Sequence, residues 1–169
     1  MNDACGHAGV GSAEPESVEP KPVVRLIALS RPSGFMASLR APGVQASEFR
    51  LHRREAAVDD RLPQPPSEDP PARSCVVGFV VPKRFCRHAV RRNLVRRVMR
   101  EALRAHVREA QVWPADPPVL VFRLMRALPA DFVSASSPKL RQYVRECAQE
   151  LLRRDAAKAA RAAAAGMLP

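Results

Sequence analysis

Ten basic side chains and one acidic side chain lie within 26 consecutive residues, a density of positive charge that suits the binding of phosphate groups. Residues 83–108 read KRFCRHAVRRNLVRRVMREALRAHVR, with Glu101 as the acid. A four-residue repeat within this segment comprises Arg92, Arg96, Arg100, Arg104 and Arg108. Like charges at this spacing destabilise an isolated helix by about 0.2–0.5 kcal/mol per pair. We therefore expect an external polyanion to relieve the repulsion.

A helical wheel divides this segment into an apolar face and a basic face. The apolar face comprises Leu94, Val95, Val98, Ala102 and Ala105. The basic face comprises Asn93, Arg96, Arg97, Arg100 and Arg104. At about 100° per residue the two sets lie opposite each other, so one should pack on the core while the other meets a ligand. Planar guanidinium groups suit phosphate because they can bind two oxygens at once.

Two other interpretations compete with nucleic-acid binding. A charged run is often only a solvated helix face, but this run has one sign and lies opposite a clear apolar face. A basic amphipathic helix can also lie on a membrane, yet the apolar residues here are mostly Val and Ala rather than the Trp, Phe and Leu that insert well. We therefore expect a nucleic acid as the partner, and no membrane.

The remaining reactive residue types form no recognisable catalytic or metal-binding set. His52 and His88 lie among arginines, where binding a metal cation would be costly. The four cysteines show no C-x-x-C spacing. Asp59 and Asp60 are adjacent, but they lie in a proline-rich stretch that should not hold them in a catalytic geometry. The sequence thus predicts no catalytic residue and no metal site in this chain, so a partner would have to supply any hydrolysis.

The composition predicts one small, basic, cytoplasmic domain with tails. The chain has 169 residues, and 28 Lys and Arg against 17 Asp and Glu give a formal net charge of +11. Such a charge attracts polyanions, and 46% hydrophobic residues are enough for a packed core. No apolar run is long enough to span a bilayer. The first 22 residues lack the apolar segment of a secretory signal.

Three segments of biased composition are expected to lie outside the folded domain. Residues 1–22 are rich in Gly, Pro and Glu, which is typical of a disordered acidic leader. Residues 59–73 contain five prolines and four acids, which predicts a disordered insertion loop. Residues 155–169 form an Ala-rich C-terminal tail, expected as a fraying extension of the last helix. An RNA-binding domain is therefore predicted over residues 23–154.

Six elements that could position the basic segment are expected within this domain, in the order α-β-β-α-β-α. They are a helix over 32–41, strands over 47–56 and 75–82, a helix over 87–108, a strand over 118–126 and a helix from 138. The last helix should begin with Ser137 as its N-cap and Pro138 at its first position. This order predicts an α+β sandwich with a small central mixed sheet and one basic helix.

Side-chain periodicity assigns faces to the first strand and the last helix. Alternation over 47–56 places Phe49 and Leu51 on one face, and Arg50, His52 and Arg54 on the other. The first strand is therefore predicted to be half-buried with a basic outer face. In the last helix the buried stripe comprises Leu140, Val144, Cys147 and Leu151.

The basic segment and the strand before it resemble the bacterial ribonuclease P protein family. The matching residues are VGFVVPKR at 77–84, AVRRNLVRR at 89–97, and the pair Arg100–Glu101. The short first helix with its phenylalanine, residues 32–35, also resembles the family, and the order of elements agrees. The resemblance covers residues 24–154 and is strongest over 76–104.

This resemblance implies a cytoplasmic ribonucleoprotein that removes the 5′ leader from precursor tRNA. The RNA subunit would hold the catalytic Mg²⁺, and the protein would assist without a cofactor or small-molecule substrate of its own. The residues implied in binding the catalytic RNA are Lys83, Arg84, Arg87, Arg91, Arg92, Asn93, Arg96, Arg97, Arg100 and Arg104. The cleft between the first helix and the sheet would take the single-stranded leader, along Phe35, Phe49, Arg50 and His52.

The chain departs from the family pattern at three places. Leu94 replaces the second arginine of an Arg-Asn-Arg core, so one contact to phosphate would be absent. Leu39 stands where an aromatic residue is common, which would weaken stacking on leader bases. The insertion at 59–73 is not a general feature of the family. A general RNA-binding protein of the ribosomal or chaperone type is the alternative, and a DNA-binding module is less favoured because no helix-turn-helix pair accompanies the basic helix.

Overall fold

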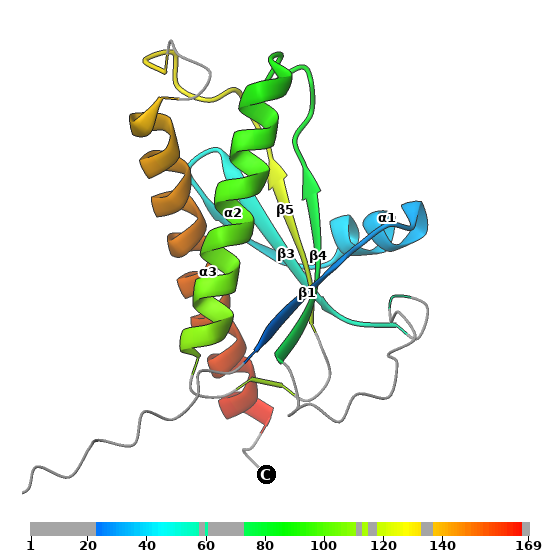
Figure 1. Ribbon diagram of the computed structural model, residues 1–169. Coiled ribbons are helices and arrows are strands. Elements are labelled where there is room, and N and C mark those ends of the chain that lie inside the picture. Colours follow the sequence, from blue (N-terminus) through cyan, green and yellow to red (C-terminus); the bar gives the residue numbers. More distant parts are fainter. Residues whose placement is uncertain are drawn as a thin grey trace, which may run out of the picture.

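The computed structural model describes residues 23–57, 60, 73–110, 113–114, 118–132 and 137–166. Over these residues the chain forms an α+β fold (Figure 1). The elements in chain order are β1 (Val24–Ala28), α1 (Pro32–Arg40), β2 (Gly43–Ala46), β3 (Phe49–Glu55), β4 (Arg73–Val80), α2 (Ala89–Glu109), β5 (Pro118–Leu124) and α3 (Pro138–Gly166).

The strands form one mixed sheet in the order β1-β4-β5-β3-β2. β1 and β5 run parallel to β4, whereas β3 pairs antiparallel with both β5 and β2. β4 and β5 therefore lie inside the sheet, and both are nearly continuous apolar runs, as strands covered on two faces require. The predicted α+β fold with a small mixed sheet is confirmed.

The two edge strands were not predicted, so the predicted order of six elements was incomplete. β1 pairs with β4 at one edge of the sheet, and β2 forms a hairpin with β3 at the other edge. β1 has five residues and β2 has four. Segments this short carry too little periodicity to identify a strand, and it is the pairing with a longer neighbour that makes them strands.

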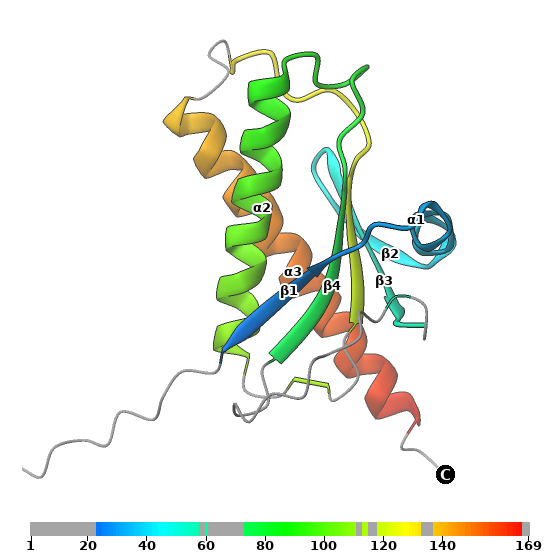
Figure 2. The same ribbon diagram turned by 45° about the vertical axis from the view of Figure 1, so that its right-hand side comes forward.

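The sheet is covered on both faces, but unequally (Figure 2). α2 and α3 pack side by side on one face, which we call the helix-pair face, and α1 alone lies on the opposite face, which we call the α1 face. The larger core lies under the helix pair and includes Phe49, Leu51 and Phe122. The smaller core, under α1, is formed by Ile27, Leu29, Val76, Val119 and Val121.

The apolar face predicted for the basic helix is confirmed at four of its five positions. Leu94, Val95, Val98 and Ala102 are buried in α2, but Ala105 is exposed. The remaining buried residues of this helix are Met99, Leu103 and Val107. The buried stripe therefore turns gradually around α2, because the helix lies against both the sheet and α3.

α3 begins where the sequence predicts and continues beyond the predicted end of the domain. The Ser137 hydroxyl accepts a hydrogen bond from the Leu140 amide at 3.1 Å, which confirms the N-cap. The predicted stripe from Leu140 to Leu151 is buried. The helix runs on to Gly166, so residues 155–166, expected as a fraying extension of the last helix, are helical. Asp155 is buried there and forms an ion pair with Arg53 of β3 at 2.9 Å.

Both ends of the predicted 59–73 insertion loop carry residues that belong to the fold. Arg73 opens β4, and its guanidinium donates to the carbonyls of Val107 and Ala110 at the end of α2. Asp60 is held by Arg54 of β3. Residues 59 and 61–72 lie outside the described residues, as do the predicted leader at 1–22 and residues 167–169.

Candidate nucleic-acid interface

The basic segment begins in a turn that exposes three of the predicted RNA-binding residues. The amides of Phe85 and Cys86 both donate to the Pro82 carbonyl at 3.1 Å and close this turn between β4 and α2. The side chains that it exposes belong to Lys83, Arg84 and Arg87. The Arg84 guanidinium lies 4.5 Å from the centre of the Phe85 ring, so a cation–π contact orients it.

Arg91 and Arg92 are partly occupied by the fold itself. The Arg91 guanidinium donates to the Phe132 carbonyl in the loop after β5. Arg92 donates from Nη1 to the carbonyls of Cys86 and Arg87, at 3.1 and 2.6 Å, and so ties the first turn of α2 to the preceding loop. Both residues are half-buried. They position the start of the basic helix, whatever else they bind.

The basic face of α2 carries the predicted residues in two kinds of environment. Asn93, Arg97 and Arg104 are exposed. Arg96 and Arg100 are half-buried. Arg97 lies 3.7 Å from Glu101 one turn later, a weak ion pair because both side chains are at least half exposed. Among the described residues, Asn93, Arg96 and Arg104 have no hydrogen-bond or ion-pair partner, and their donors are available to a ligand.

Arg100 is attached to the sheet through aromatic rings. Its guanidinium lies 5.3 Å from the centre of the Phe79 ring, and Phe79 stacks on Phe122 with ring centres 5.7 Å apart. Phe79 is in β4 and Phe122 is in β5, where the two residues are register partners. The sheet thus holds this guanidinium in place while its hydrogen-bond donors stay available. The role of Phe79 was not predicted.

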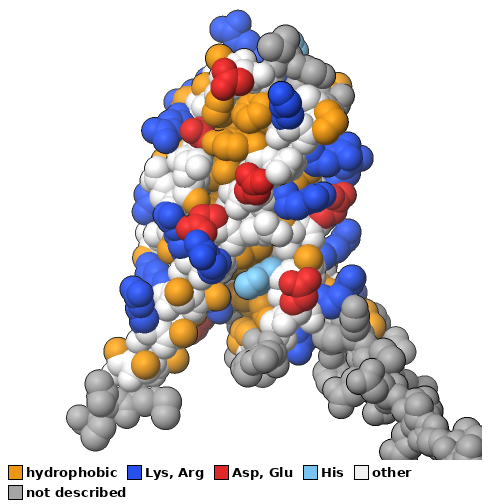
Figure 3. Space-filling model, turned by 90° about the vertical axis from the view of Figure 1, so that its left-hand side faces the viewer, with side chains coloured by type: hydrophobic (Ala, Val, Ile, Leu, Met, Phe, Trp, Pro, Cys, Tyr) orange, Lys and Arg blue, Asp and Glu red, His pale blue; other side chains and the backbone are white. Residues whose placement is uncertain are grey.

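The excess of positive charge does not extend evenly over the helix-pair face. Figure 3 shows blue basic side chains along both margins of this face, with red acidic side chains interspersed among them. On α3, Glu150 accepts a hydrogen bond from Arg154 at 2.5 Å and also pairs with Arg153. The surface of a single sign is therefore the turn at 83–88 and the first three turns of α2, before Glu101.

On the opposite side of the sheet, Phe35 of α1 packs directly against β4. A Cβ atom placed on Gly78 would come within 2.7 Å of the Phe35 ring, so the glycine is what allows this approach. Phe35 is half-buried and contacts the smaller core together with Leu39. The ring therefore has one face on the sheet and one part exposed, as a residue that stacks on a nucleic-acid base requires.

Two arginines face each other beside α1. Arg50 of β3 and Arg123 of β5 are direct register partners in the antiparallel ladder. Both are half-buried, and the Arg50 Nε atom is buried without a partner among the described residues. Like charges directly opposite each other destabilise a sheet, so this pair favours an anion between or above the two guanidinium groups. Arg123 was not among the predicted site residues.

Two of the four predicted cleft residues are not accessible on this face. Phe49 is fully buried under the helix pair, because alternation in β3 turns it away from Arg50. His52 does point toward α1, but it is only 2% exposed, and its Nδ1 donates to the Ala41 carbonyl at 3.0 Å. Burial, with the nearby charges of Arg50 and Arg123, lowers the pKa of His52. Its side chain holds the chain that leaves α1, so of the four predicted cleft residues only Phe35 and Arg50 are partly exposed on this face.

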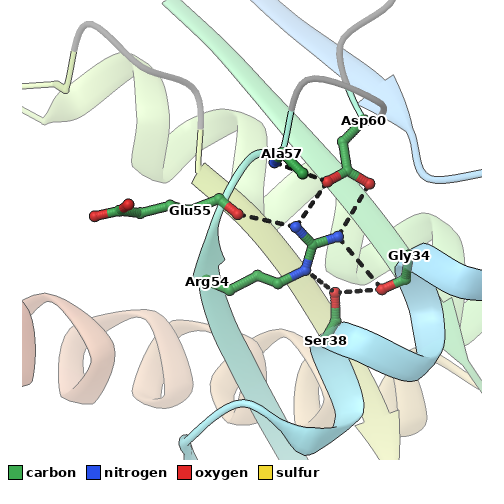
Figure 4. Close-up of polar contacts among 6 residues, drawn as sticks. All are labelled: Gly34, Ser38, Arg54, Glu55, Ala57 and Asp60. Atoms are coloured by element: carbon green, nitrogen blue, oxygen red, sulfur yellow. Dashed lines mark hydrogen bonds and ion pairs between the residues drawn. The ribbon is translucent and has the colours of Figure 1, made fainter.

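A buried polar cluster that the sequence does not predict attaches α1 to the sheet, as Figure 4 shows. We call it the Arg54 clamp, and it comprises Arg54 of β3, Gly34 and Ser38 of α1, and Asp60. Strand alternation correctly directs Arg54 toward the α1 face. The acid that pairs with it lies six residues away in a proline-rich stretch, where local sequence patterns give no signal.

The described residues include no group of three or more His, Cys, Asp and Glu side chains placed to hold a metal ion. The same residues include no helix that is both long and apolar enough to cross a membrane.

Comparison with known proteins points to one family. The family model described as Ribonuclease P matches residues 40–152. Over 77 residues the chain is 42% identical to the ribonuclease P protein components of Bordetella parapertussis and Bordetella bronchiseptica. This match covers 46% of the chain and 56% of each relative, so it spans little more than half the length of these relatives. A solved structure of the RNase P protein of Staphylococcus aureus aligns with a TM-score of 0.49 at 15% identity, over 76% of this chain and 94% of that one.

Proposed function

Because the chain belongs to the ribonuclease P family, we propose that it is the protein subunit of a ribonucleoprotein that removes the 5′ leader from precursor tRNA. The single observation that carries this proposal is the surface of one sign at the turn before α2 and along its first turns. Its unpartnered guanidinium groups are suited to phosphates rather than to any reacting bond. The catalytic RNA subunit would perform the hydrolysis with its own Mg²⁺, in the cytoplasm.

The basic surface is the proposed contact with the catalytic RNA. Lys83, Arg84 and Arg87 would bind phosphates from the turn, and Arg96 would do so from the helix, with Arg104 as a further contact beyond Glu101. Arg100, held on Phe79, would present a fixed guanidinium. Arg91 and Arg92 would contribute mainly by holding this arrangement together, since both already donate to backbone carbonyls.

The α1 face is the proposed route of the single-stranded leader. A leader has no base-paired partner, so its bases can stack on an aromatic ring while its phosphates meet basic side chains. Phe35 supplies the ring and the Arg50–Arg123 pair supplies the charge. This assignment places the two RNAs on different surfaces of the protein, with the catalytic RNA along α2 and the substrate leader beside α1.

A cleavage assay with the cognate catalytic RNA tests the proposal. Full-length protein alone should leave precursor tRNA intact at every Mg²⁺ concentration, and RNA alone should need high Mg²⁺ to screen the repulsion between phosphates. The protein should lower that requirement, because fixed arginines supply counter-charge. Cleavage by the protein alone would overturn the assignment. Binding without any gain in cleavage would instead support a general RNA-binding protein.

A further inference from the structure

We propose that Arg54 is a positioning residue for leader binding, which holds α1 over the sheet and thereby places the Phe35 ring. The inference rests on the proposed function of the α1 face. Arg54 is not placed to touch the leader, because its guanidinium is enclosed by Asp60, α1 and its own strand. Its effect on substrate would therefore pass through α1.

Every nitrogen of the Arg54 guanidinium has a partner in the clamp (Figure 4). Nη1 and Nη2 donate to the two carboxylate oxygens of Asp60, at 2.7 and 3.0 Å, in the parallel geometry of a bidentate pair. Nε donates to the Ser38 hydroxyl at 2.9 Å, and Nη2 also reaches the Gly34 carbonyl at 3.4 Å. A single side chain of β3 thus contacts α1 at two positions one turn apart.

The clamp is buried enough for its charges to matter. The Asp60 side chain is 4% exposed and the Arg54 side chain is 16% exposed. The hydrogen bonds from Arg54 outweigh the effect of burial and lower the pKa of Asp60. The Asp60 carboxylate also accepts from the Ala57 amide at 3.0 Å, which fixes it independently of Arg54. Loss of either charge would leave the other enclosed without a counter-charge, a costly state.

α1 has little else to hold it in place. It has nine residues, shorter than the length at which an isolated helix is stable in water, and no side chain caps its N-terminus. The core beneath it contains only five buried residues among those described. The Ser38 hydroxyl makes both of its hydrogen bonds within the clamp. It accepts one from Arg54 and donates one to the Gly34 carbonyl at 2.8 Å.

The path from the clamp to the leader site is short. Phe35 follows Gly34 directly and precedes Ser38 by three residues, so both contacts of the clamp border the turn that carries the ring. The lack of a side chain at Gly34 allows α1 to lie this close to its neighbours, because a Cβ there would lie 2.8 Å from Leu29 and 2.9 Å from the Asp60 carboxylate. If the clamp loosens, α1 shifts and the contact of Phe35 with Gly78 is lost.

The test uses holoenzyme assembled from full-length protein and its RNA subunit. The quantity measured is the ratio of affinities for two precursors, one with a leader long enough to cross the α1 face and one without a leader. Arg54→Lys is the principal variant, because a lysine can keep an ion pair with Asp60 but cannot reach Ser38 and Gly34 at the same time. Asp60→Asn is the second variant, and it removes the charge with little change in shape.

The matched control is Asp155→Asn. It breaks a comparable ion pair to Arg53, the neighbour of Arg54, on the helix-pair face. Arg54→Lys and Asp60→Asn should each lower the affinity ratio by about fivefold or more, the contribution of one base stacked on an aromatic ring. Asp155→Asn should leave the ratio unchanged. Phe35→Ala should by itself lower the affinity ratio. Combining it with Arg54→Lys should lower the ratio little further, since both substitutions act through the Phe35 ring.

Two outcomes overturn the inference. If Arg54→Lys binds the RNA subunit normally and keeps the wild-type ratio, Arg54 does not position the leader site. If Asp60→Asn raises affinity for the leader, Asp60 competes with a phosphate for Arg54, and the clamp opposes binding instead of supporting it. A wild-type holoenzyme that shows no leader dependence would count against the proposed route of the leader, and that result is distinguishable from both outcomes.

Discussion

Arg53 and Arg54 are adjacent in β3, yet each forms an ion pair on a different face of the sheet. Arg53 reaches Asp155 of α3 on the helix-pair face, and Arg54 reaches Asp60 on the α1 face. The first pair lies at the border of a core with 23 buried residues among those described, whereas the second lies beside a core of five. The same residue type, in the same strand, thus has very different surroundings.

The helix-pair face supplies most of the stability of the domain, and the α1 face is the one proposed to bind the leader. Under the helix pair, burial of apolar side chains supplies most of the stabilisation, and an ion pair adds only locally. Under α1 the apolar area is small, so polar contacts carry a larger share in holding the helix. The α1 face also keeps groups that the fold leaves unsatisfied, such as Arg50 opposite Arg123.

The largest effect on folding is expected from a charge placed in the larger core. Val98 is 1% exposed on the sheet-facing side of α2, so Val98→Asp should unfold the domain by enclosing an unpaired carboxylate, at a cost of several kcal/mol. Circular dichroism should show loss of the helical signal at 25 °C. A cooperative, wild-type unfolding transition in this variant would mean that α2 faces the other way.

The helix-pair face can also be predicted from the sequence more completely than the α1 face. The apolar periodicity of α2 and α3 and the N-cap Ser137 identify the helix-pair face, because burial repeats along one element. The α1 face depends on contacts between elements, which no local period reveals. Asp60 pairs with Arg54 from the start of a proline-rich stretch, and Asp155 pairs with Arg53 from 102 residues away.

Phe49 shows a second limit of local patterns. Alternation separates it from Arg50, so the two residues cannot both line one cleft, although the family resemblance implies both there. A period of two assigns residues to two faces but does not say which helix covers each face. Only the packing of α3 against β2 and β3 decides that Phe49 belongs to the larger core.

A second prediction concerns the ion pair of the helix-pair face. Asp155→Asn should lower the free energy of unfolding by about 1–3 kcal/mol, since it weakens a charge-assisted hydrogen bond and leaves Arg53 without its counter-charge. The Arg53 side chain is 34% exposed, so solvent moderates the loss. Urea unfolding monitored by circular dichroism measures it. A change below a few tenths of a kcal/mol would show that the C-terminal turns of α3 add nothing to the core.

A third prediction tests the basic surface against the rest of α2 and α3. Arg96→Ala should weaken binding of the catalytic RNA by about 1 kcal/mol and lower the slope of log K against log salt by about one, because one phosphate contact is lost. The control is Arg153→Ala, which removes an exposed arginine already paired with Glu150 on α3. Filter binding at several salt concentrations should separate the two variants. Equal effects would mean that net charge, and not position, determines affinity.

The smallest effect on stability is expected from the titration of two histidines, one on each face of the sheet. Burial lowers the pKa of His52 on the α1 face and of His106 beside α3, both from an ordinary value of 6.5. Below pH 6.5 the unfolded chain therefore binds more protons than the folded chain, so the free energy of unfolding should fall as the pH falls from about 7 to 5. Asp60 and Glu150 have lowered pKa values and act in the same direction, but only at a pH near or below 4.5.

His52→Asn isolates the contribution of the α1 face, because the asparagine amide can still donate to the Ala41 carbonyl but does not titrate. Urea unfolding at pH 7, 6 and 5 should show a shallower loss of stability than in the wild type, with the remaining loss due to His106. His106→Asn is the matched variant on the helix-pair face, and the double variant should be nearly flat over this range. A wild-type pH dependence in His52→Asn would mean that His52 accepts a proton in the folded protein as readily as in the unfolded chain. The histidine would then be a further cationic group, with Arg50, on the face proposed to bind the leader.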